Sequence, residues 1–190
     1  FDHYRKDVER LYMVRTNDGN KEGGIRTRIN YPFGNFLLEN FPEVEAAAPF
    51  HIQNEERIEV NGVHEVVKFS SAEPEWMEMM DIRIIEGNRN FMDPQSNKEV
   101  GITRELGKKW FGSERALGKE IKTHRYTKTI CAVVEVNNSH TNFAFDMIGH
   151  PELGRDWYWT HWSLLIKVKP DTNIEALEAK INANLPKEVN

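Results

Sequence analysis

The chain has 190 residues, of which 39% are hydrophobic and 11% aromatic, so it can bury a folded core and is not a disordered protein. Its net charge is −5 with both signs dispersed, which argues against a nucleic-acid-binding protein and against strong attraction to anionic lipid. No apolar run approaches the roughly 18–20 residues needed to cross a bilayer, and no signal peptide is visible. Because the chain begins at Phe1 rather than at a methionine, we expect a fragment of a longer protein.

The first part of the chain predicts a short helix over residues 1–9, a strand over 10–16 and a polar, glycine-rich loop over 17–24. A second helix is predicted over 32–40, because its aromatic residues and Leu37 recur at helical spacing. Pro42 should end this helix, since proline cannot continue it.

The middle of the chain begins with the strongest turn signal in the sequence, Asn61-Gly62, which predicts a type I′ hairpin between residues 56–60 and 63–70. A short helix is predicted over 74–80. A strand ending at Thr103 then leads into a helix, with Thr103 as its N-cap and Gly112 as its C-cap. A second hairpin follows, pairing residues 119–123 with 128–136, and a polar loop over 137–140 comes after it.

The chain closes with a strand over residues 163–169 and a terminal helix with an apolar stripe. Thr172 and Glu175 have the spacing of a capping box and predict the start of that helix. The order of elements predicts an α+β fold with two lobes. Residues 1–72 and 155–190 would form one lobe, and residues 73–154 would form a smaller inserted lobe of mixed α/β structure.

Possible catalytic and metal-binding residues are few. The densest set of candidate ligands is formed by His140, His150, His161, Asp146 and Asp156, and their spacing matches no known ligand motif, so no structural metal is expected. Adjacent serine and histidine in the polar loop do not make a catalytic triad, and no nucleophile elbow or P-loop is present. The prediction is therefore a protein that is not an enzyme and has no cofactor.

The single cysteine, Cys131, lies in an apolar run and is interpreted as a small buried hydrophobic residue. An intramolecular disulfide is excluded by its being the only cysteine.

Four large aromatic residues lie close together before the last strand: Trp157, Tyr158, Trp159 and Trp162. One interpretation is a lid over the core between the lobes. The other is an exposed contact surface for a partner, because tryptophan and tyrosine are favoured anchors at interfaces. The sequence leaves both open.

An ordered series of short motifs resembles the periplasmic core domain of MacB-like and FtsX-like ABC transporter permeases. The motifs are Arg10-Leu11-Tyr12-Met13-Val14, Phe41-Pro42-Glu43-Val44-Glu45, Ile84-Ile85-Glu86-Gly87-Asn88, Glu105-Leu106, Lys109, Phe111-Gly112, Leu117-Gly118-Lys119, Ile121, Val133-Val134, Asn138-Ser139-His140 and Phe145-Asp146. The resemblance covers residues 1–185. One departure is Glu135, at a position where the family pattern has a small residue.

The resemblance implies a porter-like α/β lobe formed by both chain ends, inserted between membrane helices, so that Phe1 and Asn190 should lie at the same end of the fold. It implies a domain at the periplasmic face of the bacterial inner membrane that couples cytoplasmic ATP hydrolysis to conformational change outside the membrane. This mechanotransmission would serve efflux, other export or the activation of a partner.

The partners implied are the membrane-embedded permease helices, an ABC ATPase subunit or domain, a second permease copy and, as a further candidate, a periplasmic adaptor. The isolated domain is expected to be a monomer. The alternative is a periplasmic ligand-recognition or sensor domain that binds a peptide or lipid, and a third interpretation is a secreted hydrolase.

Overall fold

The computed structural model describes residues 7–18, 24–95, 98–135, 144–150 and 155–187. The fold is mixed α+β, as predicted, and contacts divide the chain into two compact units. We call Tyr4–Phe50 with Leu153–Asn190 the terminal unit, and His51–Glu152 the middle unit. The expected common position of Phe1 and Asn190 lies outside the described residues. Among the described helices, none is long and apolar enough to cross a membrane.

The terminal unit contains a three-stranded antiparallel sheet in the order β1-β11-β4. A two-stranded antiparallel sheet pairs β2 with β3, and it includes both ends of the segment predicted as a loop over residues 17–24. The middle of that segment, residues 19–23, lies outside the described residues. The elements are the 3₁₀ turn η1 (Val8–Arg10), β1 (Leu11–Met13), β2 (Thr16–Asp18), β3 (Gly24–Arg26), α1 (Phe33–Asn40), the first part of β4 (Val44–Val60), β11 (Ser163–Val168) and α4 (Ile174–Ala183).

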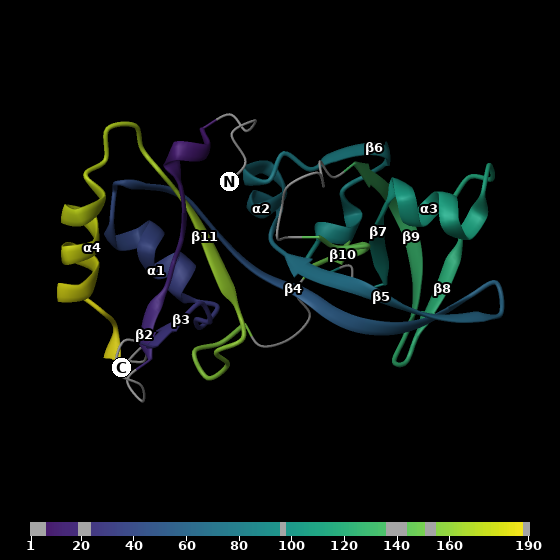
Figure 1. The fold of residues 1–190 in the computed structure, drawn as a ribbon, viewed down its shortest axis with the longest axis horizontal. Helices are drawn as coiled ribbons and strands as arrows, with labels where there is room; N and C mark the ends of the chain where they lie inside the picture. Colours follow the sequence, from purple (N-terminus) through teal and green to yellow (C-terminus); the bar gives the residue numbers. More distant parts are fainter. Residues whose placement is uncertain (1–6, 19–23, 96–97, 136–143, 151–154, 188–190) are drawn as a thin grey trace. The chain divides into compact units, whose positions relative to one another are not determined.

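The core of the terminal unit lies on the face of β11 that carries Leu164, Ile166 and Val168, all of which are buried. Leu165 on the opposite face is buried as well, whereas Lys167 is partly exposed. Leu37 from α1 and Leu177 from α4 belong to the same buried cluster, so both helices cover this face (Figure 1). Each such side chain contributes about 1.5–3 kcal/mol when fully buried. Helix α1 confirms the predicted helix, and its apolar stripe is what the cluster buries.

The start of α4 differs from the capping box predicted at Thr172. The N-cap is Asn173, whose side-chain oxygen accepts a hydrogen bond from the backbone N–H of Ala176 at 3.0 Å. The hydroxyl of Thr172 instead donates to the carbonyl of Lys169 at 2.8 Å, in the turn that precedes the helix. The cap is shifted by one residue because the turn engages the threonine side chain first.

Replacing Asn173 with alanine should therefore lower the free energy of unfolding by about 1 kcal/mol, because one N-terminal N–H of α4 loses its partner. Thr172→Ala is the matched control, and it should cost less, since its hydroxyl forms only an exposed turn contact. Urea denaturation of both variants measures the difference. A larger loss for Thr172→Ala would show that the predicted capping box operates after all.

The strands of the middle unit pair in a closed circuit. The order β4-β5-β10-β7-β9 returns to β4 through β8, which pairs with both β9 and β4, and β6 adds to the outer side of β9. A closed circuit leaves few unpaired strand edges. The elements are the later part of β4, β5 (Val63–Ala72), α2 (Pro74–Met79), β6 (Arg83–Gly87), the 3₁₀ turn η2 (Asn90–Met92), β7 (Glu99–Thr103), α3 (Arg104–Phe111), β8 (Glu120–Thr123), β9 (Thr127–Glu135) and β10 (Met147–Gly149).

The structure confirms the turn and the helix caps that the sequence predicts in the middle unit. Asn61 and Gly62 have φ values of 52° and 78°, the left-handed pair that a type I′ turn needs. The hydroxyl of Thr103 accepts from the N–H of Leu106 at 3.2 Å and caps α3. Gly112 follows this helix with φ 61°. Both predicted hairpins are present.

The β4–β5 hairpin belongs to the middle unit, whereas the sequence placed residues 56–70 in the lobe of the chain ends. Its buried residues Ile58, Val60 and Val67 share one hydrophobic cluster with Trp110 of α3 and Met147 of β10. By its contacts the middle unit begins at His51, whereas the sequence predicts an inserted lobe that begins at residue 73. The hairpin joins this unit because β4 and β5 are members of the closed circuit.

Candidate partner-contact surface

The four aromatic residues before β11 do not form one cluster, so neither interpretation of the sequence applies to all of them. Trp162 is 4% exposed and belongs to the core of the terminal unit, where its ring meets Tyr31 edge to face at 5.3 Å between centroids. An isolated β-bridge joins it to Ile29. Trp162 is therefore a core residue.

Trp157 and Asp156 hold the preceding segment in place. Trp157 is half-buried against the same core, and its carbonyl accepts a hydrogen bond from the side-chain amide of Asn30, a buried residue. The Asp156 carboxylate accepts from the backbone N–H groups of Tyr158 and Trp159 at 2.9 and 3.3 Å. These contacts fix the backbone of the two aromatic residues that follow.

Tyr158 and Trp159 are the exposed members of the group, at 83% and 45% of their maximal surface. Their rings pack edge to face at 5.5 Å between centroids, and the Trp159 ring lies 5.2 Å from that of His161. We call Tyr158, Trp159 and His161 the aromatic rim. Exposed aromatics held on a fixed backbone have the character of interface anchors.

A groove of about 560 Å³ lies in the same unit, and we call it the basic groove. Its floor is formed by the buried residues Ile29, Asn30 and Phe33. Its walls come from two exposed segments that are distant in sequence. One wall is formed by Ile25, Arg26, Thr27 and Arg28, and the other by Thr160 and His161. The half-buried Thr16 also lines the groove. Among these described lining residues, two are arginines and none is acidic.

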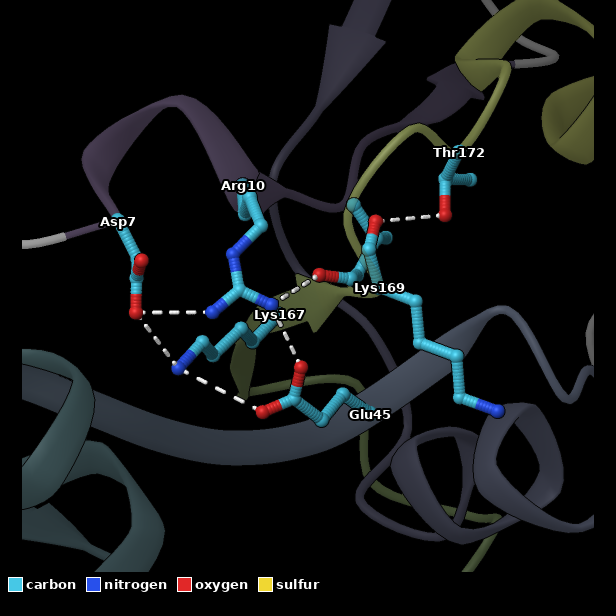
Figure 2. A network of polar contacts seen from close by, with 7 residues as sticks. Asp7, Arg10, Glu45, Lys167, Lys169 and Thr172 are labelled. Atoms are coloured by element: carbon cyan, nitrogen blue, oxygen red, sulfur yellow. Dashed lines mark hydrogen bonds and ion pairs between the residues drawn. The ribbon is translucent and has the colours of Figure 1, made fainter.

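A second charged feature of the terminal unit surrounds Arg10, and Figure 2 shows its contacts. The Arg10 guanidinium lies 2.8 Å from the Asp7 carboxylate and 2.6 Å from the Glu45 carboxylate, and it donates to the carbonyl of Val168 at 3.1 Å. Lys167 contacts the same two carboxylates at 3.1 and 3.5 Å. We call Asp7, Arg10, Glu45 and Lys167 the Arg10 cluster.

The Arg10 cluster shifts the titration of its acidic members. The hydrogen bond from Arg10 is the largest cause that lowers the pKa of Asp7, with Lys167 next. Arg10 likewise lowers the pKa of Glu45. Because both pKa values are depressed, the cluster is intact at neutral pH and weakens as the pH falls through these lowered values.

The candidate metal ligands do not come together among the described residues. His140 lies outside them, His150 belongs to the middle unit and His161 to the terminal unit. His150 is buried, with its Nε2 atom 3.4 Å from the Glu73 carboxylate. In the part of the chain that the structure describes, no three histidine, cysteine or acidic residues are grouped as a metal site would need.

Two further sequence interpretations are refined by the structure. Cys131 is half-buried rather than buried, and desolvation is the main cause that raises the pKa of its thiol to about 11. Glu135, the departure from the family pattern, lies opposite Arg83 on β6 and forms an ion pair with Arg104 at 2.9 Å. A charged residue fits there because both of its partners are arginines.

The fold and the sequence identify the family. The chain belongs to the MacB-like periplasmic core domain family, whose model matches residues 1–184. Domains of this family are periplasmic parts of ABC transporter permeases, as the resemblance predicted. Comparison with curated protein sequences gives no match.

Solved structures similar to this chain share its fold at low identity. One is a domain of a protein assigned as a permease, from Porphyromonas gingivalis, with a TM-score of 0.77, 19% identity, and coverage of 92% of this chain and 82% of that one. The periplasmic region of MacB from Actinobacillus actinomycetemcomitans has a TM-score of 0.69 and 12% identity, with coverage of 93% of this chain and 82% of that one. The extracellular domain of the ABC-type transporter YknZ from Gram-positive bacteria has a TM-score of 0.66 and 10% identity, with coverage of 93% of this chain and 95% of that one.

Sequence reasoning missed both charged features of the terminal unit. For the basic groove, a signal was present, since Arg26 and Arg28 alternate with Thr27 between two isoleucines. The Arg10 cluster had no such signal, because its members are separated by up to 160 residues and meet only when β1, β4 and β11 pair.

Proposed function

We propose that this domain transmits conformational change across a permease: ATP hydrolysis by an ABC ATPase in the cytoplasm moves it at the periplasmic face of the bacterial inner membrane. The movement would drive export or activate a partner. The partners in this proposal are the membrane-embedded helices, the ATPase, a second permease copy and a periplasmic adaptor. Membership of the family supports it, and the Arg10 cluster is the structural observation that carries it.

The Arg10 cluster connects the segment before β1 to the sheet of β1, β11 and β4 through ion pairs. Asp7 and Arg10 precede β1, Glu45 lies on β4, and Lys167 lies on β11. A membrane helix before this segment would therefore pull on two sheet strands through charged contacts as well as through β1. Several charges in one network resist separation better than isolated surface pairs do.

Arg10→Met should uncouple this segment from the sheet while leaving ATP hydrolysis intact. The experiment is hydrogen exchange in the intact permease with its ATPase, with and without ATP. We expect the wild type to show an ATP-dependent change in amide exchange over β11 and β4, and the Arg10 variant to lose most of it. The difference between the two nucleotide conditions is compared within each variant, so a general loss of stability does not mimic the effect.

Arg15→Met is the matched control, since Arg15 is an exposed arginine in the same unit outside the Arg10 cluster. It should keep the wild-type response. An unchanged ATP-dependent response in Arg10→Met would remove the Arg10 cluster from the coupling route.

The domain acts without catalysis in this proposal, because its family is a periplasmic part of permeases and its task would be movement. We also propose that the domain alone is a monomer, since the membrane helices and the ATPase would hold the permease dimer together. Metal analysis and light scattering of the purified domain test these two points. Stoichiometric zinc, or a stable dimer at micromolar concentration, would contradict the respective proposal.

The alternative, a ligand-recognition domain, has one observation in its favour. The basic groove and the aromatic rim lie in a single compact unit and offer charged, hydroxyl and aromatic groups together. Recognition and transmission are compatible, because a domain that moves must hold what it moves or activates.

A further inference from the structure

We propose that the basic groove and the aromatic rim bind an extended acidic segment of a partner protein. The inference rests on the proposed function only in supplying a periplasmic partner to a moving domain. Its physical basis is the charge, the fixed backbone, the size and the chemistry of the groove itself.

The charge of the groove differs from that of the chain as a whole. The chain carries a net charge of −5, with 30 acidic against 25 basic residues. Against this background, the described lining of the groove contains two arginines, Arg26 and Arg28, and no carboxylate. A local excess of positive charge on an acidic protein steers anionic partners to that place and repels them elsewhere.

Backbone and side-chain hydrogen bonds hold the groove in a preformed shape. Ile29 and Trp162 exchange two backbone hydrogen bonds, from the N–H of Ile29 at 2.6 Å and from the N–H of Trp162 at 3.2 Å. The Asn30 side chain adds a bond to the carbonyl of Trp157. These bonds fix the arginine wall against the aromatic segment, although about 130 residues separate the two walls. A groove that is already formed loses less conformational entropy when it binds a ligand.

The size and chemistry of the groove select the occupant. A volume of about 560 Å³ is within the range of small-ligand and peptide sites. Guanidinium groups pair with carboxylates in a planar, two-bond geometry. The hydroxyls of Thr27 and Thr160 can both donate to and accept from a peptide main chain, and Trp159 offers a flat anchor for an apolar side chain.

A peptide fits these groups better than a lipid surface does. A membrane of anionic lipid would approach the chain as a whole, and the net charge of −5 opposes that approach. A single extended acidic segment meets only the groove. Side chains alternating between acidic and apolar would face the arginines and the aromatic rim respectively.

The test uses the 190-residue chain and a short fluorescein-labelled peptide of alternating glutamate and leucine, with a lysine–leucine peptide as its charge-reversed counterpart. Fluorescence anisotropy should show binding of the acidic peptide only, weakened by added salt. The double variant Arg26→Glu, Arg28→Glu should weaken binding at least about tenfold. Trp159→Ala should weaken it by a similar factor through loss of an aromatic anchor.

Arg57→Glu, Lys108→Glu is the matched control, because it makes the same change in net charge at exposed positions of the middle unit. It should bind like the wild type. Equal binding by the groove variant, or no binding of the acidic peptide by the wild type, overturns the proposal. Phosphatidylglycerol vesicles that bind through the same arginines, with no peptide binding, overturn it in favour of a lipid headgroup. None of these measurements involves ATP, so their failure is distinct from failure of the proposed transmission.

Discussion

Replacing Trp162 with alanine should lower the free energy of unfolding by about 3–5 kcal/mol, the range for removing a large buried aromatic side chain. The ring is 4% exposed and packs with Tyr31 and with Leu164 and Ile166 of β11. The loss includes the cavity that alanine leaves among these neighbours. Denaturant unfolding followed by circular dichroism measures it, and ellipticity avoids reliance on the tryptophan signal that the variant removes.

Trp159→Ala is the matched control for Trp162→Ala, since it makes the same change three residues earlier. Its side chain is 45% exposed and contacts Tyr158 and His161 at the surface. The free energy of unfolding should stay within about 0.5 kcal/mol of the wild-type value. Equal losses for the two variants would show that the group behaves as one cluster after all.

Gly87→Ala should lower the free energy of unfolding by about 3–5 kcal/mol, because two costs combine. Gly87 has φ 89°, where an L side chain is strained by about 1–3 kcal/mol. A Cβ atom there would lie 2.0 Å from the carbonyl oxygen of Cys131 on β9. Overpacking of this kind costs about 1–3 kcal/mol, and sometimes more, because β6 must move away from β9.

Gly118→Ala separates these two costs. Gly118 has φ 80° but no atom within 4 Å of the position of an added Cβ, so only the backbone strain applies. A loss of about 1–2 kcal/mol is expected from thermal or urea unfolding. If Gly87→Ala were no worse than Gly118→Ala, the close approach of β6 to β9 would not be real.

Sequence predicted the fold best where a local signal decided the structure. The Asn61-Gly62 turn fixed one hairpin, and Thr103 fixed the start of α3, because each depends on residues within a few positions. Helix α1 followed from the spacing of its apolar residues. The family resemblance, built on an ordered series of such short motifs, was confirmed along the chain.

Elements that depend on distant partners were missed. The first part of β4 contains Pro49, and its strand conformation depends on pairing with β11, where Pro49 lies opposite Leu164. The proline is tolerated because this part of β4 is the edge of the order β1-β11-β4. Strand β10 is only three residues long and exists because β5 and β7 flank it. The later part of β4 belongs to the middle unit because β8 and β5 bring it into the closed circuit of strands.

The candidate site was predicted only in part. Sequence identified the aromatic group, and the structure separates Tyr158 and Trp159 from the buried Trp162. Nothing in the spacing of these residues reveals which of them is buried, because the segment is neither helix nor strand before the bridge at Trp162. The arginine wall of the basic groove left a signal in the sequence, but its position opposite the aromatic segment could not be predicted, because the two walls meet only through the pairing of Ile29 with Trp162.

The central claim is that ATP moves this domain, and a distance measurement between the two domains of a dimeric permease tests it most directly. A spin label on a cysteine at Glu105, an exposed position of α3, reports the distance between copies in the intact permease with its ATPase. Cys131 is half-buried with its pKa raised to about 11, so the introduced cysteine reacts much faster at neutral pH. Adding ATP should shift the peak of the distance distribution, and a hydrolysis-deficient ATPase should hold it in the shifted position. If the distance distribution stayed the same in every nucleotide state although the ATPase hydrolysed ATP, the account would be contradicted.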